Sequence, residues 1–167
     1  MKSILILKKI FGKVKNKRKL NIIKYNKRIR IKLDIDKEDF EIYITLKKFN
    51  SKYYTYIEDT DIKVLNLHNR LKGNEDLKDF VKINFNKLEV LDLSGNEISD
   101  INILENVNFK KLKELDLSEN KISDIKVLEK VKFEKLEELD LRRNEIDLTK
   151  NNLIISKLRP LLEEFVI

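Results

Sequence analysis

The sequence predicts an α/β solenoid, a domain made by stacking short units that each contribute one β-strand and one short helical segment. Two observations predict it. First, the chain repeats itself, because residues 88–111 and 112–135 are identical at 15 of 24 aligned positions. Second, each copy begins with alternating leucines and continues with apolar residues at every third position. A fixed period of about 20–50 residues is typical of solenoids and related repeat architectures.

The strand of each copy is predicted from its leucines. Three successive copies begin at Leu88, Leu112 and Leu136 and read LEVLDLSGNEI, LKELDLSENKI and LEELDLRRNEI. Within L-x-L, leucine alternates with a polar residue, as in a strand that buries one face. Strands of successive copies can therefore pair in parallel and bury a ladder of leucines.

The residues after each strand have a different period. A three-residue spacing suits a short helix or 3₁₀ segment packed on the other side of the sheet. Ser99 and Ser123 precede these segments and are predicted to be their N-caps. Phe85, Phe109 and Phe133 recur with the same period as the leading leucines and are expected to stack inside. The apolar residues with the three-residue spacing are Ile98, Ile101, Leu104 and Val107 in one copy and Ile122, Ile125, Leu128 and Val131 in the next.

The pattern L-x-x-L-x-L-x-x-N-x-I resembles the signature of the leucine-rich-repeat family, and the three copies meet it without exception. It is most similar to the short intracellular and internalin-like repeats, lengthened by about two residues. An earlier copy at residues 62–67 matches the strand, but it has Arg70 in place of the asparagine and two extra residues before Leu77. The resemblance covers residues 61–158 as about four repeats. It implies a leucine-rich-repeat solenoid with a parallel β concave face and a convex face of short helices or 3₁₀ segments.

The resemblance also implies roles for particular residues. In the family, the repeated asparagine hydrogen-bonds backbone groups of the turn and of the neighbouring coil, which suits an amide because it both donates and accepts. The family resemblance further implies protein–protein recognition through the concave sheet, as an adaptor or scaffold. The asparagines of this structural ladder are Asn96, Asn120 and Asn144.

The outward-facing positions of the strands line up across the repeats and form the predicted partner-binding surface. Its carboxylates suit a basic protein partner. The alternative interpretation is that Asp and Ser stand here only for strand and turn geometry. A metal site is not expected, because strands about 4.8 Å apart give a row of carboxylates rather than an oxygen cage. The surface has three columns: Val64, Val90, Glu114 and Glu138; Asn66, Asp92, Asp116 and Asp140; and His68, Ser94, Ser118 and Arg142.

No catalytic or cofactor site is expected. The chain has one histidine, His68, and no cysteine. A histidine acts as a general base only with a nucleophile or acid held within hydrogen-bond reach. Gly12, Gly73 and Gly95 are isolated, so no phosphate-binding loop is predicted. The sequence therefore favours a binding protein over an enzyme, with no cofactor or metal.

The N-terminal segment stands out by its charge. Residues 1–33 contain 13 of the 36 Lys and Arg and no Asp or Glu, so that all 29 Asp and Glu lie in residues 34–167. Helical spacing of apolar residues in 1–15 fits a cationic amphipathic helix that binds an anionic membrane or a partner groove. Nucleic acid is a further candidate ligand for residues 2–32. A solvated arm, or an arm folded against the acidic remainder, are the alternatives. The basic patch consists of Lys13, Lys15, Lys17, Arg18 and Lys19.

The ends of the repeat stack need caps, because a stack leaves an apolar face open at each end. Alternation of apolar and polar residues in 29–35 and 40–46 predicts a β-hairpin, with residues 52–57 as a third strand. Helical apolar spacing before Pro160 predicts a helical C-terminal cap. The predicted segments are a basic N-terminal segment (1–27), a β-rich N-terminal cap (28–60), the repeats (61–158) and the end of the C-terminal cap (159–167).

Sequence features also bear on the cellular setting. No apolar run is long enough for a membrane-spanning helix. The absence of cysteine favours a reducing, intracellular compartment, either the cytoplasm or the nucleus. We expect a monomer.

Overall fold

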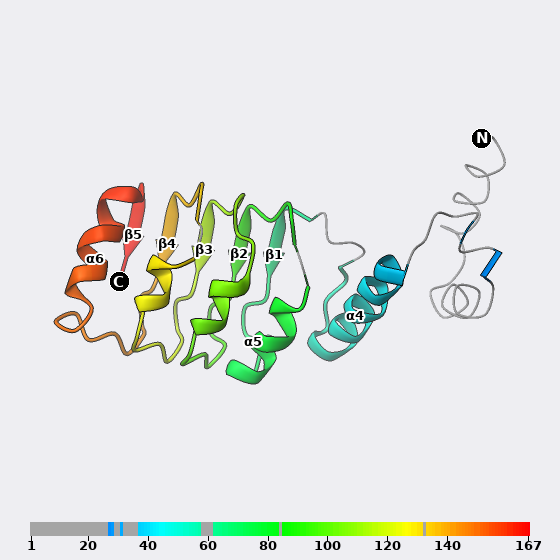
Figure 1. Cartoon of the computed structure of the whole chain (residues 1–167). Helices are drawn as coiled ribbons and strands as arrows, with labels where there is room; N and C mark the ends of the chain where they lie inside the picture. Colours follow the sequence, from blue (N-terminus) through cyan, green and yellow to red (C-terminus); the bar gives the residue numbers. More distant parts are fainter. Residues whose placement is uncertain (1–26, 29–30, 32–36, 58–61, 84, 132) are drawn as a thin grey trace. The chain divides into compact units, whose positions relative to one another are not determined.

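The computed structural model describes residues 27–28, 31, 37–57, 62–83, 85–131 and 133–167. The chain divides into two compact units, Met1–Thr45 and Leu46–Ile167. The repeats lie in the second unit, where strands line one side and short helices the other (Figure 1). None of the helices in these described ranges is long and apolar enough to cross a membrane.

One side of the second unit is a parallel sheet of five strands in the order β1-β2-β3-β4-β5. The register places each residue beside its counterpart in the next repeat, so that Leu65, Leu91 and Leu115 are neighbours. Because side chains alternate along a strand, the central residues all face the core and the flanking ones face away. The strands are β1 (Val64–Asn66), β2 (Val90–Asp92), β3 (Glu114–Asp116), β4 (Glu138–Asp140) and β5 (Glu164–Val166).

The other side of the sheet is covered by short helical segments, as the three-residue spacing predicts (Figure 1). The two copies with the clearest repeat use 3₁₀ helices. The first copy, with its two extra residues, forms a regular α-helix. The segments are α5 (Asn74–Val81), η1 (Asn102–Asn106), η2 (Lys126–Glu129), α6 (Asn152–Leu158) and η3 (Arg159–Leu161).

The start of the 3₁₀ helices differs from the prediction, which assigned serines as N-caps. The next residue in each copy closes the turn instead. Asp100 Oδ1 accepts a hydrogen bond from the backbone N–H of Asn102 at 2.8 Å, and Asp124 Oδ1 accepts one from Lys126 at 2.9 Å. An aspartate two residues before an N–H readily forms such a local turn. The serine caps at Ser99 and Ser123 are therefore wrong.

The core lies between the sheet and the helices. Leucines of the L-x-L motifs are almost completely buried, including Leu93 and Leu117. Phe109 and Phe133 stack as predicted, with ring centroids 6.0 Å apart and planes 10° apart. Phe85 stacks on Phe80 of α5, with ring centroids 5.7 Å apart. The Phe109–Phe133 pair thus joins two repeats, and Phe85 packs the segment before β2 against α5.

The predicted β-hairpin between residues 28 and 60 is wrong for the described residues. Lys37–Tyr53 form helix α4, and Ile31 is also helical. The rest of the first predicted strand lies outside the described residues. Leu46, Phe49 and Tyr53 are spaced by three and four residues, which places them on one helix face, and all three are buried. This helical period outweighs the short alternation that suggested a strand.

The last turn of α4 is attached to the first repeat by a polar cluster. Lys52 Nζ donates to Asp76 Oδ1 at 2.7 Å and to Asp79 Oδ2 at 2.9 Å, and the Tyr53 hydroxyl lies 3.1 Å from the same Asp79 oxygen. The hydrogen bond to Asp76, and then those to the other partners, raise the pKa of Lys52. Hydrogen bonds from Lys82 and then Lys52 lower the pKa of Asp79. The cluster holds this last turn against α5.

The C-terminal cap contains a strand that the sequence analysis missed. Helices α6 and η3 supply the predicted helical part, but the chain then forms β5, and Phe165 pairs with Leu139 of β4. The segment from Leu162 to Ile167 reads L-x-x-F-x-I, a degenerate form of L-x-x-L-x-L. The step along the chain from Leu139 to Phe165 is as long as the step from Leu65 to Leu91, so β5 continues the stack as a longer repeat.

Candidate functional site

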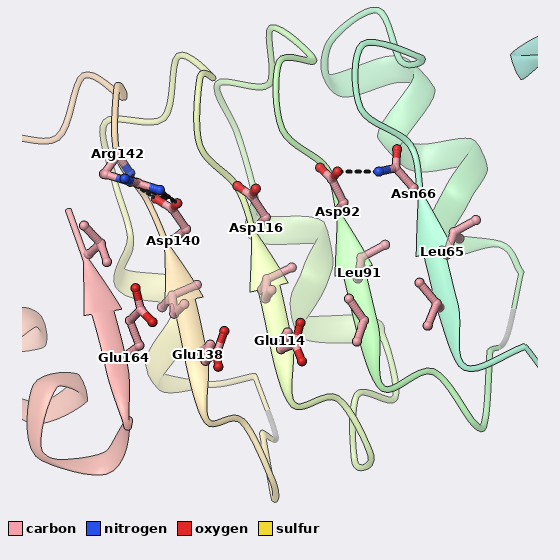
Figure 2. Close-up of a pocket in the computed structure, with 15 residues that line it drawn as sticks. Leu65, Asn66, Leu91, Asp92, Glu114, Asp116, Glu138, Asp140, Arg142 and Glu164 are labelled. Carbon is pink, nitrogen blue, oxygen red and sulfur yellow. Dashed lines mark hydrogen bonds and ion pairs between the residues drawn. The ribbon is translucent and has the colours of Figure 1, made fainter.

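The outward face of the sheet forms a groove that crosses all five strands (Figure 2). The central residues line it with their backbone, because their leucine side chains face the core. The side chains that line it come from the first and third positions of the strands and from Arg142. We call this surface the sheet groove. It is lined by Val64, Leu65, Asn66, Val90, Leu91, Asp92, Glu114, Leu115, Asp116, Glu138, Leu139, Asp140, Arg142, Glu164 and Val166.

The groove brings together the first two predicted columns and Arg142. Three residues of the predicted surface, His68, Ser94 and Ser118, are not among its lining residues. Two lining residues, Glu164 and Val166, were missed because β5 was not predicted. The degenerate repeat that includes Phe165 is the signal that would have found them.

The first column divides into an apolar and an acidic half. Val64 and Val90 lie side by side on β1 and β2, and Val64 is 63% exposed. Glu114, Glu138 and Glu164 follow in register on β3, β4 and β5, so their carboxylates stand in a row (Figure 2). Within the described parts of the chain, none of these three side chains makes a hydrogen bond or an ion pair. Desolvation, together with the charges of Glu114 and Glu164, raises the pKa of Glu138.

The aspartates of the second column also hold the turns that follow their strands. Oδ1 of Asp92, Asp116 and Asp140 accepts a hydrogen bond from the backbone N–H two residues later, at 2.9, 2.8 and 2.9 Å respectively. This is the local turn that favours Asp after a strand. The interpretation that Asp occurs at these positions because it stabilises the turn therefore applies to this column. The side chains of the glutamate column make no comparable hydrogen bond to a turn among the described residues.

Both ends of the aspartate column have partners. Asn66 Nδ2 donates to Asp92 Oδ2 at 2.7 Å (Figure 2). Arg142 contacts Asp140, with Nη2 2.5 Å from Oδ2. Burial acts to raise the pKa of Asp140, but the hydrogen bonds from Arg142 lower it below its usual value. The only cation that lines the groove among the described residues is therefore engaged by an aspartate.

His68 belongs to a hydrogen-bond chain beside the groove. Its Nδ1 lies 2.7 Å from Ser94 Oγ, which in turn donates to Asp92 Oδ1 at 2.6 Å. Its Nε2 lies 2.8 Å from Asn69 Nδ2. A serine that donates its proton to a carboxylate is not poised to give it to histidine, as an activated nucleophile must. These hydrogen bonds therefore order the turns that follow β1 and β2. Glycine is needed at position 95, because a Cβ there would lie 2.3 Å from Asn69 Oδ1.

The asparagine ladder sets the spacing of the turns next to the groove. Asn120 Nδ2 donates to the carbonyls of Leu93 and Leu117, both at 3.0 Å. Its Oδ1 accepts hydrogen bonds from the N–H groups of Asn96 and Ile98 at 3.0 and 2.9 Å. The asparagines of the flanking repeats donate in the same way to the carbonyl of the leucine that follows the strand, in their own and in the preceding repeat. Each asparagine thus joins two repeats.

Two further predictions concern metal ions and the basic patch. Over the described ranges, no group of His, Asp and Glu side chains is arranged to hold a metal ion. The basic patch around Lys13–Lys19 lies outside the described residues.

Comparison with known proteins identifies the repeat. The family model for the leucine rich repeat matches residues 87–146, which include strands β2, β3 and β4. No curated protein matches the chain. Leucine-rich repeats generally mediate protein–protein interactions and are typically not enzymes. The matched segment, the parallel strands and the asparagine ladder together show that residues 87–146 are leucine-rich repeats.

Proposed function

We propose that this protein binds a protein partner through the sheet groove and acts as an adaptor or scaffold. One observation carries the proposal: the groove displays side chains that the fold itself does not use. The side chains of Glu114, Glu138 and Glu164 make no hydrogen bond or ion pair within the described parts of the chain, and Val64 exposes 63% of its surface. Solenoids use such extended faces for recognition because rigid stacking holds many side chains in fixed positions.

A blocking experiment tests the use of this face without assuming the chemistry of the partner. Val64→Trp combined with Glu138→Trp places two large side chains in the groove at exposed positions. A partner isolated with the full-length protein, then identified and purified, should bind this variant at least about tenfold more weakly, which corresponds to about 1.4 kcal/mol. Titration calorimetry with the purified partner measures the change.

The matched control places the same side chains on the opposite face. Asn102→Trp and Lys126→Trp lie in η1 and η2, where both native residues are exposed. This variant should bind the partner as the wild type does. The proposal is wrong if the control loses binding while the groove variant keeps it.

The N-terminal charge favours a second candidate function, a tether to nucleic acid or to an anionic membrane through residues 2–32. The 13 basic and no acidic residues of 1–33 support it. If the segment binds nucleic acid through about six phosphate contacts, affinity should fall about a thousandfold between 50 and 200 mM salt. A membrane tether should bind anionic vesicles and weaken on Phe11→Glu, because it also needs an apolar face. Absence of binding to duplex, single strand and anionic vesicles at low salt excludes the tether.

A further inference from the structure

Charges on neighbouring repeats are complementary over much of the solenoid. Equivalent residues of adjacent repeats lie side by side, so each charged position meets its own counterpart. Lys121 Nζ lies 3.2 Å from Glu97 Oε2, and Lys63 Nζ lies 2.6 Å from Glu89 Oε1. Lys63 lowers the pKa of Glu89. Further pairs of this kind are Lys110–Glu134, Lys113–Glu137 and Arg143–Glu119. Lys157 of α6 also pairs with Glu129 of η2, although the two positions are not equivalent.

The sheet groove departs from this pattern. Its two columns place like charges on neighbouring strands: Glu114, Glu138 and Glu164 in one, Asp92, Asp116 and Asp140 in the other. Like charges opposite one another destabilise a sheet. The register of the sheet does not require like charges on neighbouring strands. The position just before the glutamate column alternates in charge, as Lys63, Glu89, Lys113 and Glu137 from β1 to β4.

The aspartates have a structural reason to repeat, since each closes its turn. The glutamates have none, and their repulsion opposes folding. A row of like charges that costs stability and has no partner within the described parts of the chain is suited to a ligand of opposite charge. Beside it on the same column stand the exposed Val64 and the half-buried Val90. The column therefore presents apolar contact on β1 and β2 and negative charge on β3 to β5.

We propose that the sheet groove binds a polypeptide segment of another protein that has apolar side chains over β1–β2 and several Lys or Arg over β3–β5. This inference rests on the proposed function and names the chemistry of its partner. Charge-assisted hydrogen bonds from Lys or Arg to carboxylates are among the strongest available at a surface. Nucleic acid and anionic lipid do not suit this face, because the carboxylates repel phosphate.

A defined peptide tests the proposal with the full-length protein. The probe is a fluorescent peptide with the sequence VVGRRRR, and its binding is followed by anisotropy at 50 mM salt. Glu114→Gln, Glu138→Gln and Glu164→Gln, combined in one variant, should weaken binding at least tenfold. Its denaturation midpoint should rise above that of the wild type, because the repulsion between the glutamates is removed.

The control variant removes the same number of charges outside the groove. It combines Glu97→Gln, Glu119→Gln and Glu129→Gln, three glutamates that each have a basic partner in a neighbouring repeat. Its affinity for the peptide should change by less than twofold. Equal weakening of both variants would mean that the peptide responds only to net charge, and that result overturns the proposal, as does unchanged binding to the groove variant.

The apolar half has its own test. The peptide SSGRRRR should bind the wild-type protein more weakly than VVGRRRR, and Val64→Ser should abolish that difference. Equal binding of the two peptides to the wild type overturns this part of the proposal.

The outcome separates this inference from the proposed function. One outcome is that a natural partner loses binding to the Val64→Trp, Glu138→Trp variant and still binds the triple glutamine variant unchanged. That result keeps the groove as the binding site and refutes the proposal that the partner segment is basic. A partner that binds both variants unchanged refutes both.

Discussion

Replacement of Phe109 by Ala should lower the free energy of unfolding by about 3–5 kcal/mol. Phe109 is 2% exposed and stacks on Phe133 of the next repeat. The substitution removes the ring and leaves a cavity between two repeats, which the stacked backbone cannot close. Urea denaturation followed by circular dichroism measures the loss.

A surface leucine provides the control for this change. Leu161 is 73% exposed, and Leu161→Ala should cost less than about 0.5 kcal/mol. If the two variants unfolded at the same urea concentration, Phe109 would not be part of a packed core between repeats.

Replacement of Asn120 by Ala should cost about 3 kcal/mol, because an unsatisfied buried group costs about 1–3 kcal/mol and two are created here. The side chain is 6% exposed, and its removal leaves the buried N–H groups of Asn96 and Ile98 without an acceptor. The carbonyls that receive its amide lose a donor as well. Guanidinium denaturation measures the difference in free energy of unfolding, provided that the wild type and the variant depend equally steeply on denaturant.

The adjacent Lys121 is the matched control for this position. Its ion pair with Glu97 is exposed on both sides, and exposed pairs contribute about 0–1 kcal/mol. Lys121→Ala should therefore cost less than about 0.5 kcal/mol. An Asn120→Ala protein as stable as the Lys121→Ala protein would argue against a hydrogen-bond ladder between the repeats.

The repeats could be predicted from the sequence because three levels of the pattern agree. The leucine alternation defines the strand, the three-residue spacing defines the helical side, and the constant period from Leu88 to Leu112 to Leu136 defines how copies stack. Each buried leucine is therefore specified both locally and by its neighbours in the next repeat. Such agreement between local and long-range preferences is what allows a fold to be inferred from one sequence.

The N-terminal prediction failed because the local pattern there was ambiguous. Ile42, Ile44 and Leu46 alternate as in a strand, yet Leu46, Phe49 and Tyr53 lie on one face of a helix. A short apolar run does not by itself separate the two periods. The helical interpretation required the longer window that extends to Tyr53, whose hydroxyl contacts Asp79 of α5.

The candidate site was predicted in outline but not at its C-terminal end. The register of L-x-L strands brings the outward residues into columns, so Glu114 and Glu138 could be placed together from sequence. Glu164 could not, because Phe165 stands where the earlier copies have leucine, and α6 and η3 lengthen the step from β4 to β5. The sequence also could not predict that these glutamates have no ion-pair partner among the described residues, because that depends on which neighbouring charged side chains reach one another in the fold.

Mapping the contact surface on the folded protein tests the role of the sheet groove most directly. In a titration of the ¹⁵N-labelled protein of 20.0 kDa with its purified partner, chemical shifts should change for backbone amides of β1 to β5 and of the turns that follow them. Amides of α5, η1, η2 and α6 should keep their positions. Shift changes confined to those helical segments, with the strands unaffected, would contradict the assignment of the sheet groove as the binding surface.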